Sequence, residues 1–222
     1  LIHNENVVIA STNFGYIKRM TEDNFRAQNR GGRGIVGMKP IDEDYIRDLL
    51  MINTHGYVMF FTNFGRAYRL KVYEIPEASR TARGTAMVNL LQLNPGEKVN
   101  AILPVDSFED NQCVFMVTKN GIIKKTPLID FANIRKNGII AIGLDDDDDL
   151  NWVKQAEDKD EIIIGTSRGM AIRFGINDLR PLGRSARGVN SMKLRTGDTI
   201  IGCDIVPRDK DGDLLLITND GF

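Results

Sequence analysis

The chain has 222 residues, 42% of them hydrophobic, a formal net charge of −1 and a pI of about 6.2. This hydrophobic content is enough to form a globular core, and the near-neutral charge excludes a uniformly basic nucleic-acid-binding protein. With two histidines, and with Cys113 and Cys203 in separate apolar runs, zinc sites and histidine-based catalysis are not expected. Any nucleic-acid site must therefore depend on where the charges lie.

Targeting and membrane signals are weak. No apolar run approaches the roughly 18 residues of a membrane span, and no signal peptide opens the chain. We therefore expect a cytoplasmic protein with no membrane partner. Because the sequence starts at Leu1 and stops at Phe222, just after a turn glycine, we expect it to be part of a longer polypeptide.

Taken in chain order, the sequence repeats a Thr-x-x-Gly turn five times. The turn glycines are Gly15, Gly65, Gly121, Gly169 and Gly221, which are 50, 56, 48 and 52 residues apart. An apolar run such as VVIAST or YVMFFT precedes each of the first four turns, and a run such as YIKRM or RAYRL follows it. Each of these turns therefore predicts a β-hairpin, and the period of the chain is about fifty residues.

A second element follows each of the first four hairpins after 17 to 19 residues. It is a basic loop that ends in glycine, with the sequences NRGGRG, RTARG, IRKNG and RSARG ending at Gly34, Gly84, Gly138 and Gly188. Single helical turns are expected before it, at EDNF, YEIP, LIDF and INDL. A third short strand (IVGMK, TAMVNLL, IIAIGL, VNSMKL) and a fourth strand (RDLLMIN, KVNAILPV, NWVKQAE, TIIGCDIV) are expected after it.

Four strands in each repeat of about fifty residues predict an all-β propeller of four-stranded blades. The repeats are expected at residues 1–53, 54–108, 109–158 and 159–208, with the start of a fifth at 209–222. A ring closes only when its last blade meets its first. About four and a half repeats should therefore form an open arc.

Basic residues recur at fixed positions of the repeat, which maps them to one edge of the molecule. The predicted DNA-contacting residues on the second strands and later loops are Lys18, Arg19, Arg66, Arg69, Arg83, Lys124, Lys125, Arg173 and Arg187. Arg80 and Arg184 are equally consistent with ordinary solvated or salt-bridged side chains. Carboxylates gather elsewhere, most densely at Asp145–Asp149, which we interpret as a solvated loop. The alternative is that this run competes with DNA for the basic edge.

The first basic loop is the richest. Its predicted binding residues are Gln28, Arg30, Gly31, Gly32, Arg33 and Gly34. Guanidinium groups match phosphate oxygens, and the glycine pair lets the backbone approach a ligand closely. Taken alone, the segment is also consistent with a glycine-rich turn whose arginines are solvated. Its repetition favours phosphate binding.

The run QNRGGRG at 28–34 resembles the signature box of the C-terminal domain of the bacterial DNA gyrase A subunit, and NVVIASTNFGYIKRM is similar to that family's repeats. The family pattern is Gln-Arg-Arg-Gly-Gly-Arg-Gly, from which this sequence departs at Asn29. The alternative is the paralogue, the topoisomerase IV A subunit, whose boxes are degenerate or missing. The resemblance implies a six-bladed β-pinwheel, a propeller in which neighbouring blades exchange strands.

The resemblance also implies a function. Such a domain wraps double-stranded DNA around a basic rim, so that an ATP-dependent type II topoisomerase introduces negative supercoils. The implied partners are DNA, the rest of the gyrase A subunit and the gyrase B subunit. The active-site tyrosine belongs to the N-terminal part of the A subunit, so this segment is expected to hold no catalytic residue and no metal. No cofactor is expected in it either, since ATP and Mg²⁺ act elsewhere in the holoenzyme.

Other functions remain open on the residues alone. A protein-interaction propeller could use its arginines for acidic partners, whereas a free-standing enzyme lacks any nucleophile, base or metal constellation. Residues 32–37 match G-x-G-x-x-G, but the preceding segment is polar and Pro40 follows closely, which argues against a dinucleotide site. The alternating aspartates Asp209, Asp211 and Asp213 resemble the start of a calcium-binding loop. The sixth position of such a loop requires glycine but holds Leu214, and no glutamate stands at the twelfth.

Overall fold

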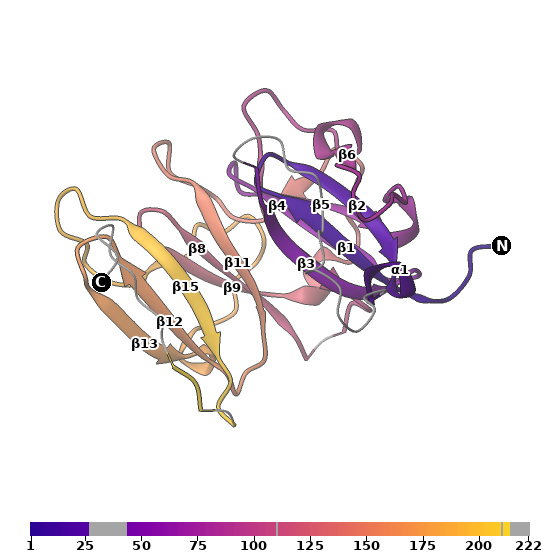
Figure 1. The fold of residues 1–222 in the computed structure, drawn as a ribbon. Coiled ribbons are helices and arrows are strands. Elements are labelled where there is room, and N and C mark those ends of the chain that lie inside the picture. Colours follow the sequence, from indigo (N-terminus) through magenta and orange to yellow (C-terminus); the bar gives the residue numbers. More distant parts are fainter. Residues whose placement is uncertain (27–43, 110, 210, 214–222) are drawn as a thin grey trace.

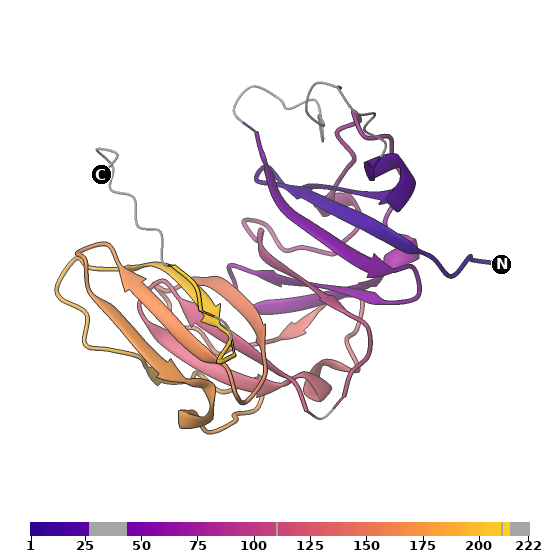
Figure 2. The ribbon, with the colours of Figure 1, turned by 60° about the horizontal axis from the view of Figure 1, so that its bottom comes forward.

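The structure, a computed structural model, describes residues 1–26, 44–109, 111–209 and 211–213. In these residues the chain forms antiparallel sheets and short helical turns, which confirms the predicted all-β class. Four small sheets follow one another from the N-terminal to the C-terminal end along a curved path (Figures 1 and 2). The sheets do not close on themselves within the described ranges, so the arc is open.

Each sheet is built around one predicted hairpin. The first sheet contains β1 (Asn6–Thr12), β2 (Tyr16–Thr21), β3 (Ile46–Asn53) and β6 (Thr85–Ala86). The second contains β4 (Tyr57–Thr62), β5 (Arg66–Lys71), β7 (Val99–Val105) and β10 (Ile139–Ile140). The third contains β8 (Cys113–Thr118), β9 (Ile122–Pro127), β11 (Leu150–Ala156) and β14 (Val189–Asn190). The fourth contains β12 (Glu161–Thr166), β13 (Ala171–Gly175) and β15 (Ile200–Val206).

Short helical turns lie between the strands. They are α1 (Glu22–Arg26) and the 3₁₀ turns η1 (Val72–Glu74), η2 (Met87–Asn89), η3 (Leu128–Phe131) and η4 (Ile176–Asp178). Four of them, all but η2, fall where a turn was predicted after the second strand. The third strand of each repeat is only two residues long where the structure describes it, shorter than the sequence suggests.

Neighbouring repeats exchange these short strands. The strand order of the first sheet is β3-β1-β2-β6, and β6 comes from the second repeat. In the same way, β10 of the third repeat pairs with β5, and β14 of the fourth repeat pairs with β9. The exchange that the resemblance implied is therefore present at all three junctions between the described sheets.

The fourth strands mark the opposite edge of each sheet, where consecutive sheets meet. Strands β3, β7, β11 and β15 contact one another in that order. Arg47 on β3 donates a hydrogen bond to the carbonyl of Val99, and Asn100 Nδ2 donates to the carbonyl of Leu150 at 2.9 Å. The exchanged strands β6, β10 and β14 consequently lie at what we name the outer edge of the arc.

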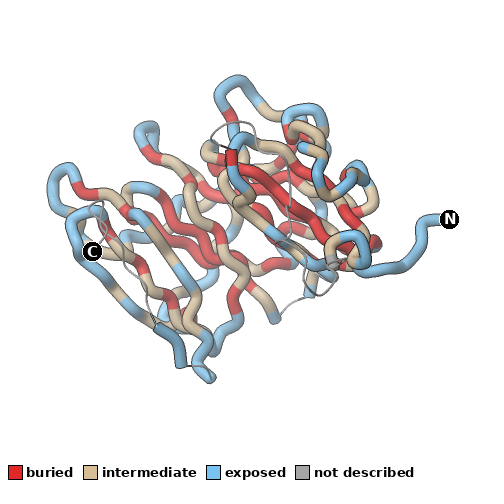
Figure 3. The backbone as a smooth tube through the Cα atoms, in the orientation of Figure 1, coloured by how far each residue is buried: buried red, intermediate tan, exposed pale blue. Residues whose placement is uncertain are grey.

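The core lies between consecutive sheets. Val58 and Phe60 of β4 pack toward the first sheet, whereas the alternate residues Met59 and Phe61 pack toward the third. Phe115 of β8 continues the pattern toward the fourth sheet. Because both faces of the central strands are covered, their sequences are apolar throughout rather than alternating. Figure 3 shows these buried stretches running along the middle of the arc.

Two glycines fix the exchanged strands in place. Gly84 and Gly188 end the basic loops with φ of +94° and +97°. A Cβ atom at either position would lie 2.4 Å from a backbone carbonyl oxygen of the preceding sheet, that of Ile17 or Ile123. Only glycine therefore lets the loop pass so close to the edge strand.

We expect Gly188→Ala to destabilise the chain by about 2–4 kcal/mol, since it combines a left-handed backbone with a steric clash. Gly169→Ala is the matched control, because Gly169 has φ +77° but open space around it, and it should cost only about 1–2 kcal/mol. Chemical denaturation measures both. Equal losses would show that the close approach at Gly188 carries no energetic weight.

Candidate nucleic-acid interface

The basic loops of the second, third and fourth repeats lie at the outer edge. The basic loop of the first repeat lies outside the described residues. Gln28, Arg30, Gly31, Gly32, Arg33 and Gly34 all fall within residues 27–43, outside the described residues. Their role in DNA binding stays a prediction. The later copies of the loop, at residues 79–84 and 183–188, show how this element is held.

Two lysines predicted to contact DNA are instead buried inside the protein. Lys18 is 0% exposed, and its Nζ donates hydrogen bonds to the carbonyl oxygens of Ser79, Arg80 and Ala82 at 2.6–3.0 Å. These acceptors belong to the basic loop of the next repeat. The side chain therefore faces a protein carbonyl cage rather than solvent, and a direct phosphate contact does not fit this geometry.

Lys124 repeats this arrangement two repeats later. It is 1% exposed, and its Nζ donates to the carbonyl oxygens of Ala141, Gly183, Arg184 and Ala186 at 2.6–3.1 Å. Burial lowers the pKa of both Lys18 and Lys124 to about 8, and the nearby charge of Arg184 contributes for Lys124. A pKa of about 8 still leaves most of each group charged at neutral pH.

Lys125 is also structural. Its side chain is 5% exposed, and its Nζ donates to the carbonyl of Ile176 at 3.2 Å and lies 3.5 Å from Asp158. For all three lysines the predicted strand was correct and the predicted exposure was wrong. A buried ammonium group with several carbonyl acceptors is satisfied internally.

The strand arginines mostly brace the next repeat. Arg19 Nε donates to the carbonyl of Ile75 at 3.0 Å, Arg66 Nη2 to that of Asn137 at 2.7 Å, and Arg69 Nη1 to that of Ala132 at 2.5 Å. Arg69 also stacks over the rings of Tyr57 and Phe108. Part of the hydrogen-bonding capacity of these guanidinium groups is therefore taken up by contacts within the protein.

Arg173 differs because it forms an exposed ion pair with Glu161 on the neighbouring strand. Its side chain remains more than half exposed, at 58%. A surface pair of this kind contributes little to stability and is easily exchanged for another anion. The geometry thus leaves Arg173 available to a ligand if this pair is given up.

The two loop arginines predicted as contacts, Arg83 and Arg187, are both exposed. The guanidinium of Arg83 lies over the ring of Tyr16, 5.2 Å from its centroid. Arg187 forms a two-point ion pair with Asp145, with Nε and Nη2 at 2.8 and 2.7 Å from the carboxylate oxygens. The hydrogen bond from Arg187 lowers the pKa of Asp145.

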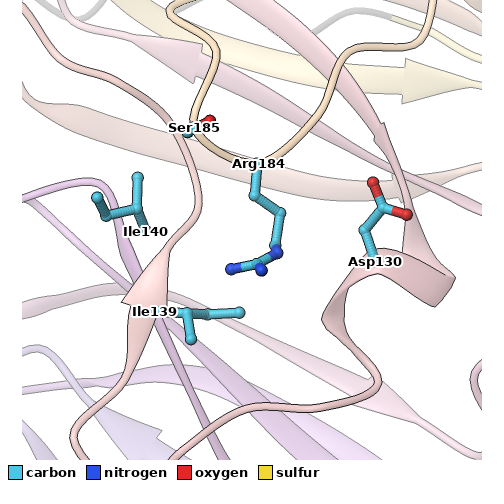
Figure 4. A pocket seen from close by; sticks show the side chains of 5 residues that line it. All are labelled: Asp130, Ile139, Ile140, Arg184 and Ser185. Carbon is cyan, nitrogen blue, oxygen red and sulfur yellow. The ribbon is translucent and has the colours of Figure 1, made fainter.

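For Arg184 the sequence did not distinguish a DNA contact from an ordinary solvated or salt-bridged side chain. With Asp130, Ile139, Ile140 and Ser185, it lines a hollow between the third and fourth repeats. Figure 4 shows its guanidinium pointing into this hollow, with Ile139 on one side and Asp130 on the other. Its place in the repeated loop, equivalent to Arg80, was the signal that could have identified it.

The acidic run also has a structural member. Asp148 is 7% exposed, and its Oδ1 accepts hydrogen bonds from the backbone N–H groups of Asn120 and Asp149. Asp44 and Asp198 hold the hairpin turns of the first and fourth sheets in the same way. The interpretation of residues 145–149 as wholly solvated was therefore wrong at Asp148, which clamps a turn.

Known proteins match the chain closely. The family model described as "DNA gyrase C-terminal domain, beta-propeller" matches residues 6–54, 56–106, 114–157 and 160–207. The chain belongs to this family. The four matched segments cover most of the chain.

Curated relatives of this gyrase C-terminal domain carry the name of the DNA gyrase A subunit. The protein from Clostridium acetobutylicum is 51% identical over 189 residues, which are 85% of this chain and 23% of the relative. The protein from Staphylococcus epidermidis is 41% identical over the whole chain and 25% of its own length. The chain thus spans about a quarter of the curated relatives it matches.

Solved structures agree with this assignment. The C-terminal domain of DNA topoisomerase IV aligns with a TM-score of 0.79 at 27% identity, covering 93% of this chain and 62% of that one. A DNA gyrase A C-terminal domain aligns with a TM-score of 0.68 at 28% identity, covering 90% and 64%. Both confirm the fold that the sequence predicted.

In this gyrase C-terminal domain the exposed and half-exposed cations of the described loops gather at the outer edge. We name them the perimeter cations: Arg80, Arg83, Arg135, Lys136, Arg184 and Arg187. They come from the loops of the second, third and fourth repeats, each of which enters the preceding sheet at that edge. Among the described residues, no group of three or more histidine, cysteine, aspartate or glutamate side chains is arranged to hold a metal ion, and no helix could cross a membrane.

Proposed function

We propose that this chain binds double-stranded DNA and bends it along the outer edge of the arc. The observation that carries the proposal is the repetition of arginine loops at the outer edge of successive sheets in a member of the gyrase family. Repeated cations on a curved edge supply phosphate contacts at intervals. Contacts to phosphate position DNA without reading its sequence, so little sequence preference is expected.

The energetics favour a distributed interface. Bending a short duplex by 40–90° costs about 1–6 kcal/mol, which contacts spread along the curve must offset. The perimeter cations come from three consecutive repeats, so each of these repeats can contribute contacts to the DNA phosphates. A neutral total charge does not oppose this, because the carboxylates of Asp148 and Asp198 lie at hairpin turns, whereas the perimeter cations lie on the loops.

The role in a larger enzyme extends the proposal. In the context of the longer relatives, the bent DNA would be presented to the breakage-and-rejoining part of an ATP-dependent type II topoisomerase, which then introduces negative supercoils. The proposed partners are the rest of the gyrase A subunit and the gyrase B subunit, in the cytoplasm. This segment would act without a cofactor or catalytic residue of its own.

A topoisomerase IV role is the second candidate, because the topoisomerase IV domain aligns with the higher TM-score. The two roles differ in outcome on relaxed plasmid. A gyrase context should yield negative supercoils, whereas a topoisomerase IV context should not. The identity of 41% and 51% to two DNA gyrase A subunits favours the first.

DNA affinity should depend steeply on salt. The slope of log K against log salt falls by about 0.9 for each phosphate contact, so Arg83→Ala and Arg187→Ala should each reduce its magnitude by about that amount. Fluorescence anisotropy with a labelled duplex, repeated over a range of salt, measures it. Lys119→Ala is the control, because this exposed lysine lies on a hairpin turn rather than on a loop. A near-zero slope for the unmodified chain would refute the proposal.

Asp145 competes with DNA for the guanidinium of Arg187, so Asp145→Asn should strengthen DNA binding. Exposed ion pairs are worth about 0.2–1 kcal/mol, which corresponds to a gain of about 1.5- to 5-fold in affinity. Asp146→Asn removes the same charge from a neighbouring exposed residue that has no ion pair within the described part of the chain, and it should give a smaller gain. Titration of a labelled duplex with both variants compares them. Equal gains would show that only the overall charge matters.

A further inference from the structure

The loops that cross to the preceding sheet differ in length. After the 3₁₀ turn that precedes it, the loop spans ten residues in the second repeat (75–84) and in the fourth (179–188), but seven in the third (132–138). The third repeat therefore reaches the second sheet with three residues fewer than the second repeat has when it reaches the first sheet.

At the first junction, three loop residues complete the edge of the sheet. The N–H group of Arg19 on β2 donates to the carbonyl of Pro76 at 3.1 Å, and the N–H group of Ala78 donates to the carbonyl of Arg19 at 3.0 Å. Between these two residues, Glu77 pairs with Arg19 as a parallel β-bridge, and its carboxylate lies 3.9 Å from the Arg19 guanidinium. An acidic segment of the chain itself thus covers this edge.

The corresponding edge of the second sheet is uncovered. Arg69 of β5 stands, like Arg19 of β2, four residues after the turn glycine, and alternate residues of a strand direct their backbone groups to the same neighbour. Its N–H and C=O groups therefore face the outer edge. In the described structure β10 pairs only with the first two residues of β5, and no backbone hydrogen bond joins Arg69 to the loop at 132–138. At the third junction the equivalent Lys125 does accept one, from Leu182 at 2.8 Å.

A hollow of about 500 Å³ lies beside this uncovered edge. It is bordered by β5 on one side and by the short loop on the other. Its lining includes the cations Arg69, Lys71 and Lys136 and the apolar side chains of Leu70, Leu90 and Ile134. The hollow therefore offers an open strand edge, positive charge and an apolar wall in one place.

The cations of the hollow are not neutralised by the fold. The guanidinium of Arg69 and the ammonium of Lys71 lie 4.6 and 3.8 Å from the centre of the Tyr57 ring, which also lines the hollow. Neither of them, nor Lys136, forms an ion pair with a described residue. Among the described lining residues the one carboxylate is Glu74, which accepts a hydrogen bond from the backbone N–H of Lys71 at 2.7 Å. The charge of the lining favours an anionic occupant.

We propose that the hollow binds an extended acidic segment of a partner protein, which adds to β5 as residues 76–78 add to β2. The segment donates an N–H group to the carbonyl of Arg69 and accepts a hydrogen bond from its N–H group. A carboxylate of the segment lies near Lys71 and Lys136, and an apolar neighbour packs on Ile134. This is recognition by strand addition, with charge selecting the sequence.

A DNA phosphate is the alternative occupant, and two features of the hollow disfavour it. A phosphodiester has no N–H group to offer the carbonyl of Arg69, and it gains nothing from the apolar wall formed by Leu70, Leu90 and Ile134. A peptide segment meets both. The proposal therefore concerns a protein partner and does not depend on DNA binding.

The test uses a peptide with blocked ends and the sequence of residues 74–79 of this chain, Glu-Ile-Pro-Glu-Ala-Ser. It is added to the ¹⁵N-labelled chain, and the amide signals are followed by NMR. We expect the signals of Arg69 and Lys71 to shift, whereas those of Arg19 and Lys125, whose edges are already paired, stay in place. No shift at Arg69, or equal shifts at all three edges, would overturn the proposal.

Two altered peptides separate strand addition from simple charge attraction. The peptide with Ala78→Pro keeps its charge but lacks the N–H group that pairs with the strand, so the shift at Arg69 should be lost. The peptide with Glu77→Gln keeps the N–H group and should bind about 1.5- to 5-fold more weakly, as expected for an exposed ion pair. Undiminished binding of the Ala78→Pro peptide would contradict strand addition.

A pair of chain variants locates the charge. Lys136→Gln should weaken peptide binding about 1.5- to 5-fold, because Lys136 lines the hollow. Arg135→Gln is the matched control, since Arg135 is an equally exposed neighbour that does not line it. Equal losses in the two variants would show that only the overall charge of the loop attracts the peptide.

Lengthening the short loop tests the origin of the hollow. Insertion of Pro-Glu-Ala after Ala132 gives the third repeat a loop of ten residues, like the loop at 75–84. The inserted residues should cover the edge at Arg69 and abolish the peptide-dependent shifts. Unchanged amide signals in the first and fourth sheets report that the chain is folded. Retained peptide binding would contradict the assignment of the hollow to the missing residues.

Titrations with inorganic phosphate and with a short duplex complete the test. If inorganic phosphate shifts Arg69 and Lys71 as strongly as the peptide does, the hollow is a phosphate site and the proposal is overturned. If the peptide binds and the duplex does not, the peptide site stands and the proposed function fails. If the duplex binds and the peptide does not, the proposed function stands and the peptide site is wrong.

Discussion

The structure depends on how each repeat is joined to the sheet before it. A basic loop crosses to the outer edge of the preceding sheet and adds its last strand there. At two of the three described junctions the loop closes around a buried lysine of that sheet, Lys18 or Lys124, and passes the edge at a glycine with no room for a side chain. The same contact that holds two sheets together therefore determines where the loop arginines stand.

This joint explains how a chain of near-zero net charge can present a basic surface. Carboxylates at one repeated position clamp hairpin turns, as Asp44, Asp148 and Asp198 do, by accepting hydrogen bonds from backbone N–H groups there. Cations at other repeated positions either brace the next repeat from inside or stand exposed on the loops. The fifty-residue period separates the two signs in space, so local charge rather than total charge governs binding.

Hairpins, fourth strands and the all-β class could be predicted because the turn glycines and apolar runs are local signals with a regular spacing. The burial of Lys18 and Lys124 could not be predicted. Each occupies the third position after a turn glycine, in a strand whose neighbours Ile17 and Ile123 are buried, and a lysine there normally indicates a solvated face. What buries it is a loop about sixty residues later, and such a distant partner leaves no mark in the strand itself.

Bending of DNA along the loop-bearing edge can be observed as the distance between the two ends of a duplex longer than the arc. Energy transfer between dyes at those ends, followed as the chain is added, measures this distance. The ends should approach each other on binding, and less so when Arg83 and Arg187 are replaced by alanine. Binding with an unchanged distance between the ends would contradict the wrapping of DNA around this edge.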